Sequence, residues 1–240
     1  MFTVQRRDQV RAELLARARA DERVVGAART GSAARGAEDR WSDIDLFLGV
    51  RADVDAVISD WSAVLYSEYR AVHHFDLPAG PTTYRAFLLP DGLEVDLGFA
   101  PAARFGPVGD GAFDVVFGEP VSRRRPSRTD TDHLVGLGWH HALHARVAIE
   151  RDRPWAAEHW ISALRDQVLI LACVRHALPS GYAKGAHELP EPELAALDAA
   201  LVRSLDRTEL TRARAAAVEA FLAELRHVDP DLTARIAVTL

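Results

Sequence analysis

Two aspartates, Asp43 and Asp45, stand one residue apart at the head of an apolar run that continues from Leu46 to Val50. Alternate residues of a strand point to the same face, so the two carboxylates would project together from one side. A carboxylate inside an apolar strand is costly unless a cation or hydrogen-bond donors compensate its charge. The pair therefore predicts a cation site, and a cation held in this way usually takes part in chemistry.

A third acidic residue, Asp96, stands inside a second apolar run, residues 93–99. Two-metal phosphoryl or nucleotidyl transfer uses carboxylates that hold two Mg²⁺ ions about 4 Å apart. Residues two apart on a strand are separated by about 6.5–7 Å at Cα, which suits such a pair of ions. We expect Asp43, Asp45 and Asp96 to bind Mg²⁺. Glu94 shares a face with Asp96 and could be a further ligand, a base or an outer-shell residue.

A Gly31-Ser32 pair precedes the aspartates, and Arg35 follows it closely. Glycine lets backbone N–H groups approach a phosphate, serine adds a hydroxyl donor, and arginine neutralises negative charge. We interpret the three residues as a triphosphate-binding segment. Each feature alone could be an ordinary turn or loop, but their combination with the carboxylates favours a functional site.

Regular elements must position these residues. Hydrophobic spacing predicts helices at 4–20 and 53–69 and strands at 23–28, 44–50, 84–89 and 93–99. The strand at 44–50 is apolar on almost every residue after Asp45, so we expect it to be central and covered on both faces. The last two strands are joined by Pro90-Asp91-Gly92, in which Asp-Gly is a strong hairpin signal.

The second half of the chain has a different character. Residues 100–130 are rich in Gly, Pro and Arg, and we place a linker at 121–130. Beyond it the pattern predicts only helices, at 131–151, 154–177, 191–205, 207–227 and 230–239. The predicted fold is therefore α+β: a domain at 1–120 with a mixed sheet flanked by helices, followed by an all-α domain at 131–240.

Composition narrows the class of protein. The 240 residues are 48% hydrophobic and 27% charged, with a net charge of −6, which argues against a dedicated nucleic-acid binder. A single cysteine, Cys173, allows no intramolecular disulfide. The chain has no apolar run near 18 residues and no export signal at its start, so we expect a cytoplasmic protein that does not bind membranes.

The runs Gly31-Ser32, Ser42–Leu46 and Glu94–Leu97 resemble the signature of the DNA polymerase β-like nucleotidyltransferase superfamily. The fuller pattern around Arg35 and Gly36 is similar to that of its small bacterial members, which include antibiotic nucleotidyltransferases. The resemblance covers about residues 25–99. The helical half is similar only in general character to the helical domains of the aminoglycoside and lincosamide enzymes.

This resemblance implies a role for each of the candidate residues. Asp43 and Asp45 would ligate both metals and Asp96 the catalytic one, while Gly31 and Ser32 would bind the β- and γ-phosphates. A substrate hydroxyl would attack the α-phosphate of Mg-ATP and release pyrophosphate. The general base would be Asp96, Glu94 or Glu158. Some relatives are dimers with a shared cleft, so the resemblance also allows a homodimer.

The helical half offers weaker candidates. Glu158, Ser162, Arg165 and Asp166 share one polar face of the helix at 154–177, which is either a solvated face or one that supplies a base (Glu158) and a phosphate contact (Arg165). In the loop at 180–185, Lys184 could reach the triphosphate and Tyr182 could stack on a base. A plain surface loop is the alternative.

Two further patterns favour structural roles. His140 and His144 have the i, i+4 spacing of a zinc pair, but no cysteine or Glu motif accompanies them, so we interpret them as packing or solvated histidines. The basic run 123–128 could grip RNA, but it is short and belongs to a negatively charged protein.

We therefore predict an enzyme that transfers AMP from ATP to a hydroxyl of a small molecule, such as an aminoglycoside or lincosamide antibiotic. One alternative keeps the chemistry but makes the acceptor a protein, as in antitoxin-type nucleotidyltransferases. Another is a nucleotide-binding protein without turnover. Polymerisation of nucleic acid is disfavoured by the lack of a basic track.

Overall fold

The computed structural model describes residues 1–51, 53–107, 111–122 and 130–240. Contacts among these residues divide the chain into two compact units, 1–127 and 128–240, and each is described by itself. The basic run 123–128 lies outside the described residues, and so does most of the predicted linker at 121–130.

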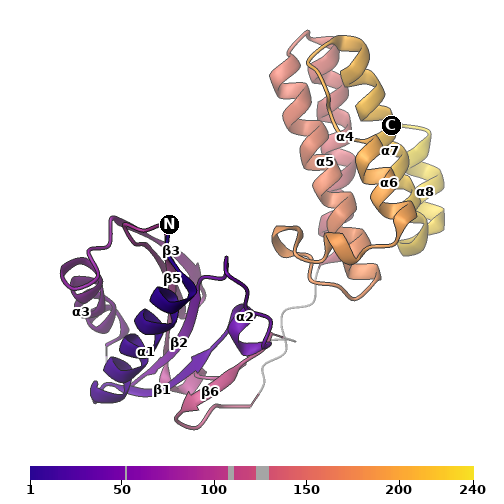
Figure 1. The fold of residues 1–240 in the computed structure, drawn as a ribbon. Coiled ribbons are helices and arrows are strands. Elements are labelled where there is room, and N and C mark those ends of the chain that lie inside the picture. The colour runs from indigo at the N-terminus through magenta and orange to yellow at the C-terminus, as the bar shows by residue number, and fades with distance from the viewer. Residues whose placement is uncertain (52, 108–110, 123–129) are drawn as a thin grey trace. The chain divides into compact units, whose positions relative to one another are not determined.

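The N-terminal unit is α+β, as the sequence predicts, and Figure 1 shows its helices packed on a sheet. Its elements in chain order are α1 (Val4–Ala20), β1 (Val24–Arg29), α2 (Gly31–Ala34), β2 (Ile44–Val50), α3 (Val54–Ser67), β3 (His73–Ala79), β4 (Thr82–Leu88), β5 (Glu94–Pro101), the 3₁₀ turn η1 (Ala102–Arg104) and β6 (Asp114–Phe117).

Within the described residues the strands form a mixed six-stranded sheet in the order β3-β4-β5-β2-β1-β6. The strand that carries Asp45, β2, is central, as predicted, and Asp43 lies just before it. It runs antiparallel to β1 and parallel to β5. The predicted hairpin joins β4 to β5, and Gly92 in its turn has φ +82°, a conformation that favours glycine.

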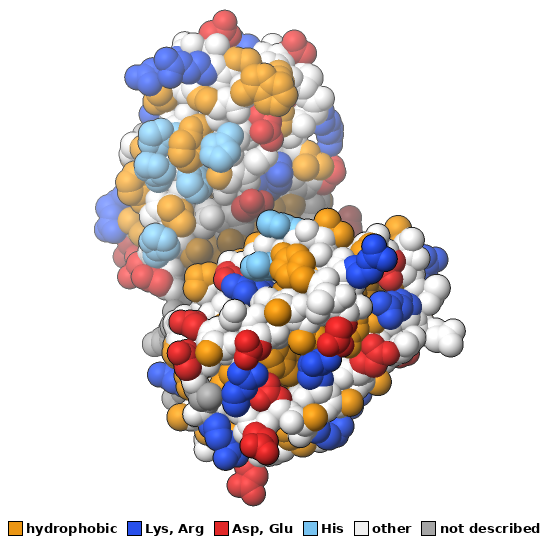
Figure 2. Space-filling view, turned by 90° about the vertical axis from the view of Figure 1, so that its left-hand side faces the viewer, with side chains coloured by type: hydrophobic (Ala, Val, Ile, Leu, Met, Phe, Trp, Pro, Cys, Tyr) orange, Lys and Arg blue, Asp and Glu red, His pale blue; other side chains and the backbone are white. Residues whose placement is uncertain are grey.

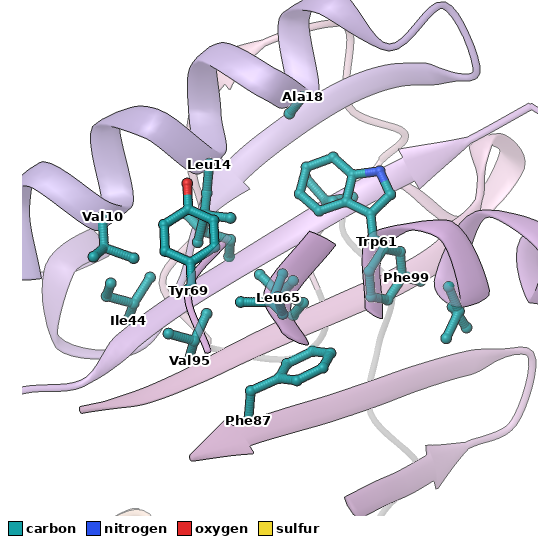
Figure 3. Close-up of a cluster of buried hydrophobic side chains, with 14 of the residues drawn as sticks. Val10, Leu14, Ala18, Ile44, Trp61, Leu65, Tyr69, Phe87, Val95 and Phe99 are labelled. Atoms are coloured by element: carbon teal, nitrogen blue, oxygen red, sulfur yellow. The ribbon is translucent and has the colours of Figure 1, made fainter. Parts of the chain in front are cut away.

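One face of the sheet is covered by α1 and α3. Val10, Leu14 and Ala18 of α1 are buried against the strands, together with Trp61 and Leu65 of α3 (Figure 3). Every second residue of the strands joins this core, because strand side chains alternate between faces; Ile44, Leu46, Leu48, Val95, Leu97 and Phe99 do so. We call this the helix side of the sheet.

On the opposite side a smaller aromatic cluster covers only part of β1 and β2. Phe47 contacts Phe105 and Phe113, with ring centroids 6.4 and 5.7 Å apart. The Phe105 ring lies against Gly26 and Gly49, where a Cβ would be 2.5 and 2.7 Å from its nearest side-chain atoms. β2 is therefore covered on its second face at Phe47, while Asp45 remains half-buried and outside the cluster.

The C-terminal unit is all-α, as predicted. Its helices are α4 (Thr131–Glu150), α5 (Pro154–Arg175), α6 (Glu191–Ala199), α7 (Arg207–Val228) and α8 (Pro230–Ala237), with 3₁₀ turns η2 (Gly181–Ala183) and η3 (Ala186–Glu188) after α5. Small residues allow close packing: Gly138 of α4 lies directly against the Phe221 ring of α7, where a Cβ would overlap the ring. Within the described ranges no helix has the length and apolar character needed to cross a lipid bilayer.

Two strands are absent from the sequence predictions. β3 forms the edge beside β4, and β6 forms the other edge beside β1, within the Gly-, Pro- and Arg-rich stretch 100–130. Both are edge strands with partly or fully exposed residues, so the buried apolar alternation that identifies a strand is weak in them.

Candidate active site

Asp45 and Asp96 lie directly opposite each other on the parallel strands β2 and β5. Their neighbours on the two strands, Ile44 with Val95, are buried in the helix-side core. Both carboxylates therefore project from the opposite face of the sheet, where each residue is half-buried. This register places two of the predicted acidic site residues next to each other on neighbouring strands.

Asp43 precedes β2 and is half-buried. It follows the turn at residues 39–42, in which Ser42 N–H donates to the Asp39 carbonyl (3.3 Å). The Trp41 backbone N–H and the Ser42 hydroxyl both donate to the Asp39 carboxylate, at 2.8 and 3.1 Å, and these bonds lower the pKa of Asp39. The turn thus fixes the chain just before Asp43.

Gly31 places backbone directly against the Asp45 carboxylate. A Cβ at residue 31 would overlap Asp45 Oδ2 and come within 2.7 Å of its Cγ, and Gly31 has φ +56°. Next to it, the Thr30 N–H donates to the Asp45 carbonyl at 3.1 Å. Glycine is therefore required both by the backbone conformation and by the close approach.

Ser32 and Arg35 differ in their surroundings. Ser32 is half-buried in the short helix α2, and its carbonyl accepts from the N–H groups of Arg35 and Ala37 (3.2 and 3.1 Å). Arg35 is exposed at the end of α2. Glu94 is exposed at the start of β5, opposite Leu88. Ser32, Arg35 and Glu94 therefore remain candidate site residues because of their positions alone.

The sequence predictions missed Arg7, an α1 residue whose side chain is only 4% exposed. Its Nη1 donates to the carbonyls of Asp39 (2.6 Å) and Ser42 (3.4 Å), and its Nε lies 3.5 Å from Glu38 Oε1. Arg7 thereby ties α1 to the turn that leads into Asp43. The available signal was its position: Arg7 lies on the buried face of α1, three residues before Val10.

The donor set suits a hard divalent cation, because it consists of carboxylate oxygens from adjacent strands. Asp96 Oδ1 is shielded from solvent, and the Asp45 carboxylate lies in the space that a side chain at residue 31 would fill. Yet in the described part of the chain no three His, Cys, Asp or Glu side chains are already gathered as a metal site. The register pairs Asp45 with Asp96, and Asp43 precedes β2, two residues before Asp45.

In the helical unit the predicted polar face of α5 is hydrogen-bonded. The Ser162 hydroxyl donates to Glu158 (2.7 Å), and Arg165 Nη2 donates to Ser162 Oγ (3.3 Å). Lys184 and Tyr182 are exposed in and after η2. The structure therefore brings Glu158 and Arg165 together within this unit, as it brings Gly31, Asp45 and Asp96 together within the other.

The histidines form an aromatic cluster on α4 and α5. The ring centroids of His140 and His144 are 4.2 Å apart, and Trp160 lies 5.9 and 4.9 Å from them. His141 and His159 also contact Trp160. Figure 2 shows histidines among hydrophobic side chains on this unit. Burial, followed by the neighbouring histidines, lowers the pKa of His141.

Two of the surface pockets in the described part of the chain lie away from the carboxylate pair. One, of about 270 Å³, is lined by residues of α1 and α3 and by the segment after α1, including Asp21 and Trp61. Another, of about 180 Å³, lies among α5, α6 and α7 near Arg175 and Glu224. Neither includes a residue predicted to act in the reaction.

No protein-family model matches the chain, and no curated protein matches it. Among solved structures, the chain is similar to an aminoglycoside 6-adenyltransferase from Bacillus subtilis, with 14% sequence identity and a TM-score of 0.41 over 97% of this chain and 92% of that one. An identity and a TM-score this low leave the function to be inferred from the residues of the site.

Proposed function

We propose that the chain is a divalent-cation-dependent nucleotidyltransferase that moves AMP from ATP to a hydroxyl of a small molecule. The observation that supports this best is the carboxylate pair: Asp45 and Asp96 face each other across β2 and β5, with the Gly31 backbone against the Asp45 carboxylate. A pair of half-buried carboxylates beside a glycine turn suits a cation with a bound polyphosphate.

Each step of the reaction has a candidate group. The acceptor oxygen forms a bond to the α-phosphorus, the bond from that phosphorus to the bridging oxygen breaks, and pyrophosphate leaves. Asp43, Asp45 and Asp96 would hold Mg²⁺, which neutralises charge on the phosphates when bound. The acceptor proton would pass to Asp96, Glu94 or Glu158.

Phosphate binding is assigned to the α2 segment. The Gly31 backbone and the Ser32 hydroxyl would donate to the β- and γ-phosphates, and the exposed Arg35 guanidinium would add positive charge. From the helical unit, Arg165 and Lys184 would supply further cationic contacts to the nucleotide, and Tyr182 a surface for its base.

The acceptor class follows from the sequence resemblance: an antibiotic of the aminoglycoside or lincosamide type. Modification of a protein hydroxyl and nucleotide binding without turnover are the competing functions. The intact set of Asp43, Asp45 and Asp96 favours turnover over binding alone.

Mass spectrometry tests this proposal. The protein is incubated with Mg²⁺, one of the four nucleoside triphosphates and a panel of hydroxylated antibiotics. We expect a mass increase of one nucleoside monophosphate on at least one compound, with ATP as donor, and no increase with Asp43→Ala. An adduct on a protein instead would move the acceptor to the antitoxin-type alternative. The absence of any adduct, with Asp43→Ala indistinguishable from the parent, would refute the proposal.

A further inference from the structure

The edge strand β3 and its neighbour β4 expose apolar side chains beside the carboxylate pair. Phe75 and Leu77 of β3 are 51% and 42% exposed, and Leu88 of β4 is 48% exposed. With the half-buried Tyr84 they form what we call the apolar strip. Edge strands usually carry charges that discourage association, so an exposed apolar edge suggests a binding surface.

The strand register connects this strip to the carboxylates. Phe75 lies opposite Ala86 of β4, Ala86 lies opposite Asp96, and Asp96 lies opposite Asp45. Cross-strand partners share a face, so the row from Phe75 to Asp45 lies on one side of the sheet.

A second row runs parallel to the first. Leu77 lies opposite Tyr84, and Tyr84 lies opposite Gly98 of β5. The Tyr84 ring covers Gly98, where a Cβ would be 2.9 Å from it, and its centroid is 5.9 Å from that of Phe47. The strip is therefore continuous with the aromatic surface beside the carboxylates.

The alternation in β3 is the reverse of an ordinary surface strand. Two of its polar residues face the helix side, where His74 is hydrogen-bonded to Tyr66 (2.7 Å) and Asp76 accepts from Arg85 (2.6 Å), whereas the exposed His73 shares the face of Phe75 and Leu77. Arg85 also donates to Ser62 of α3 at 2.8 Å. The apolar residues Phe75 and Leu77 are on the carboxylate side, where a ligand that covers them would remove apolar surface from water.

The geometry of in-line displacement at phosphorus indicates from which side the acceptor reaches the nucleotide. Nucleophile and leaving group lie roughly in line on opposite sides of the phosphorus that is attacked. Gly31 follows β1, so it approaches Asp45 from the β1 side of the sheet. If Gly31 and Ser32 hold the departing pyrophosphate, the acceptor approaches from the other side, over β5, β4 and β3.

We infer that the apolar strip binds the acceptor, and that the acceptor is an amphipathic compound with an apolar portion and a hydroxyl that reaches Asp96. This inference rests on the proposed function and narrows it. Phe75, Leu77, Tyr84 and Leu88 carry no charge, and the carboxylates on this face, Glu94, Asp96 and Asp45, lie on β5 and β2 at the border of the strip. A polycationic sugar would need carboxylates along its whole length to compensate its ammonium groups. Within the proposed antibiotics, the strip favours the lincosamide type over the aminoglycoside type.

Calorimetry without nucleotide tests the binding step separately from turnover. The probes are lincomycin, which is amphipathic with one basic amine, and kanamycin, which is a polycation. The variant is Phe75→Ser with Leu77→Ser. Its matched control is Val115→Ser on β6, the opposite edge strand, where Val115 is 37% exposed and lies opposite Ala28 of the aromatic cluster.

We expect lincomycin to bind the parent and Val115→Ser equally, and to bind the double variant at least about tenfold more weakly. Kanamycin should bind more weakly than lincomycin to the parent and to Val115→Ser. Equal lincomycin binding by parent and double variant, no binding to the parent, or tighter binding of kanamycin would each overturn the inference. So would a fall in the melting temperature of the double variant with binding unchanged, because the strip would then serve packing.

The proposed function can fail independently. Asp45→Asn should abolish pyrophosphate release and leave lincomycin binding intact. Where lincomycin is a substrate, the double variant should raise its KM with little change in kcat or in the KM for ATP. A lower kcat with an unchanged KM would contradict a binding role for the strip.

Discussion

At the scale of single residues, the site depends on where side chains are absent as much as on where they are present. Gly31 has a left-handed backbone and leaves the space that the Asp45 carboxylate occupies. Gly98 gives the same kind of space to the Tyr84 and Phe47 rings. A carboxylate held against backbone in this way keeps a fixed position relative to the strand opposite.

Replacing Gly31 and Gly36 with alanine, one at a time, should separate the effect of the Gly31–Asp45 contact from the effect of backbone strain at a positive φ. The new Cβ would overlap Asp45 Oδ2, so we expect pyrophosphate release to fall about 100-fold, because small displacements of catalytic groups are costly. Gly36→Ala is the matched control: Gly36 has φ +65° and open space around it, so it should lose about 1 kcal/mol of stability and little activity. Pyrophosphate release measures the activity of both variants, and urea unfolding measures their stability. Equal losses of activity in the two variants would show that the contact with Asp45 is irrelevant.

At the scale of elements, the register between β2 and β5 brings the acidic residues together, and α1 secures the turn before them. Ile44 and Val95 fix the register by packing on the helix side, so their neighbours Asp45 and Asp96 are presented together on the other. Arg7 of α1 then holds the turn at 39–42 through its two carbonyl contacts. The helix thus stabilises the segment that leads into Asp43.

The substitution Arg7→Met tests whether Arg7 stabilises the turn at 39–42. It keeps the stem of the side chain but leaves the carbonyls of Asp39 and Ser42 and the Glu38 carboxylate without the guanidinium. We expect a loss of about 2–4 kcal/mol in the free energy of unfolding. Arg6→Met, which removes a half-exposed ion pair with Asp91, should cost less than about 1 kcal/mol. Urea denaturation of both variants measures the difference, and similar losses would refute a special role for Arg7.

At the scale of the whole molecule, the sequence predicts an α+β unit followed by an all-α unit. It does so because the regular spacing of apolar residues identifies the buried helices and strands. The central strand and the β4–β5 hairpin follow from strong local signals, and Asp45 and Asp96 stand out as acidic residues at or within apolar runs. The register that places these two residues opposite each other comes from the structure. The edge strands β3 and β6 could not be predicted in this way, since their exposed faces lack the buried pattern. Arg7 was missed because a charged residue in an amphipathic helix is normally solvated.

The central claim is that Asp45 and Asp96 act together in nucleotidyl transfer. The most direct measurement is pyrophosphate release with Mg-ATP and the hydroxylated panel, compared among Asp45→Asn, Asp96→Asn and a control, Asp55→Asn, an exposed residue of α3 on the other side of the sheet. We predict a loss of at least about 100-fold for the first two and near-parental rates for the control. Parental rates in Asp45→Asn or Asp96→Asn, or an equal loss in Asp55→Asn, would contradict the claim.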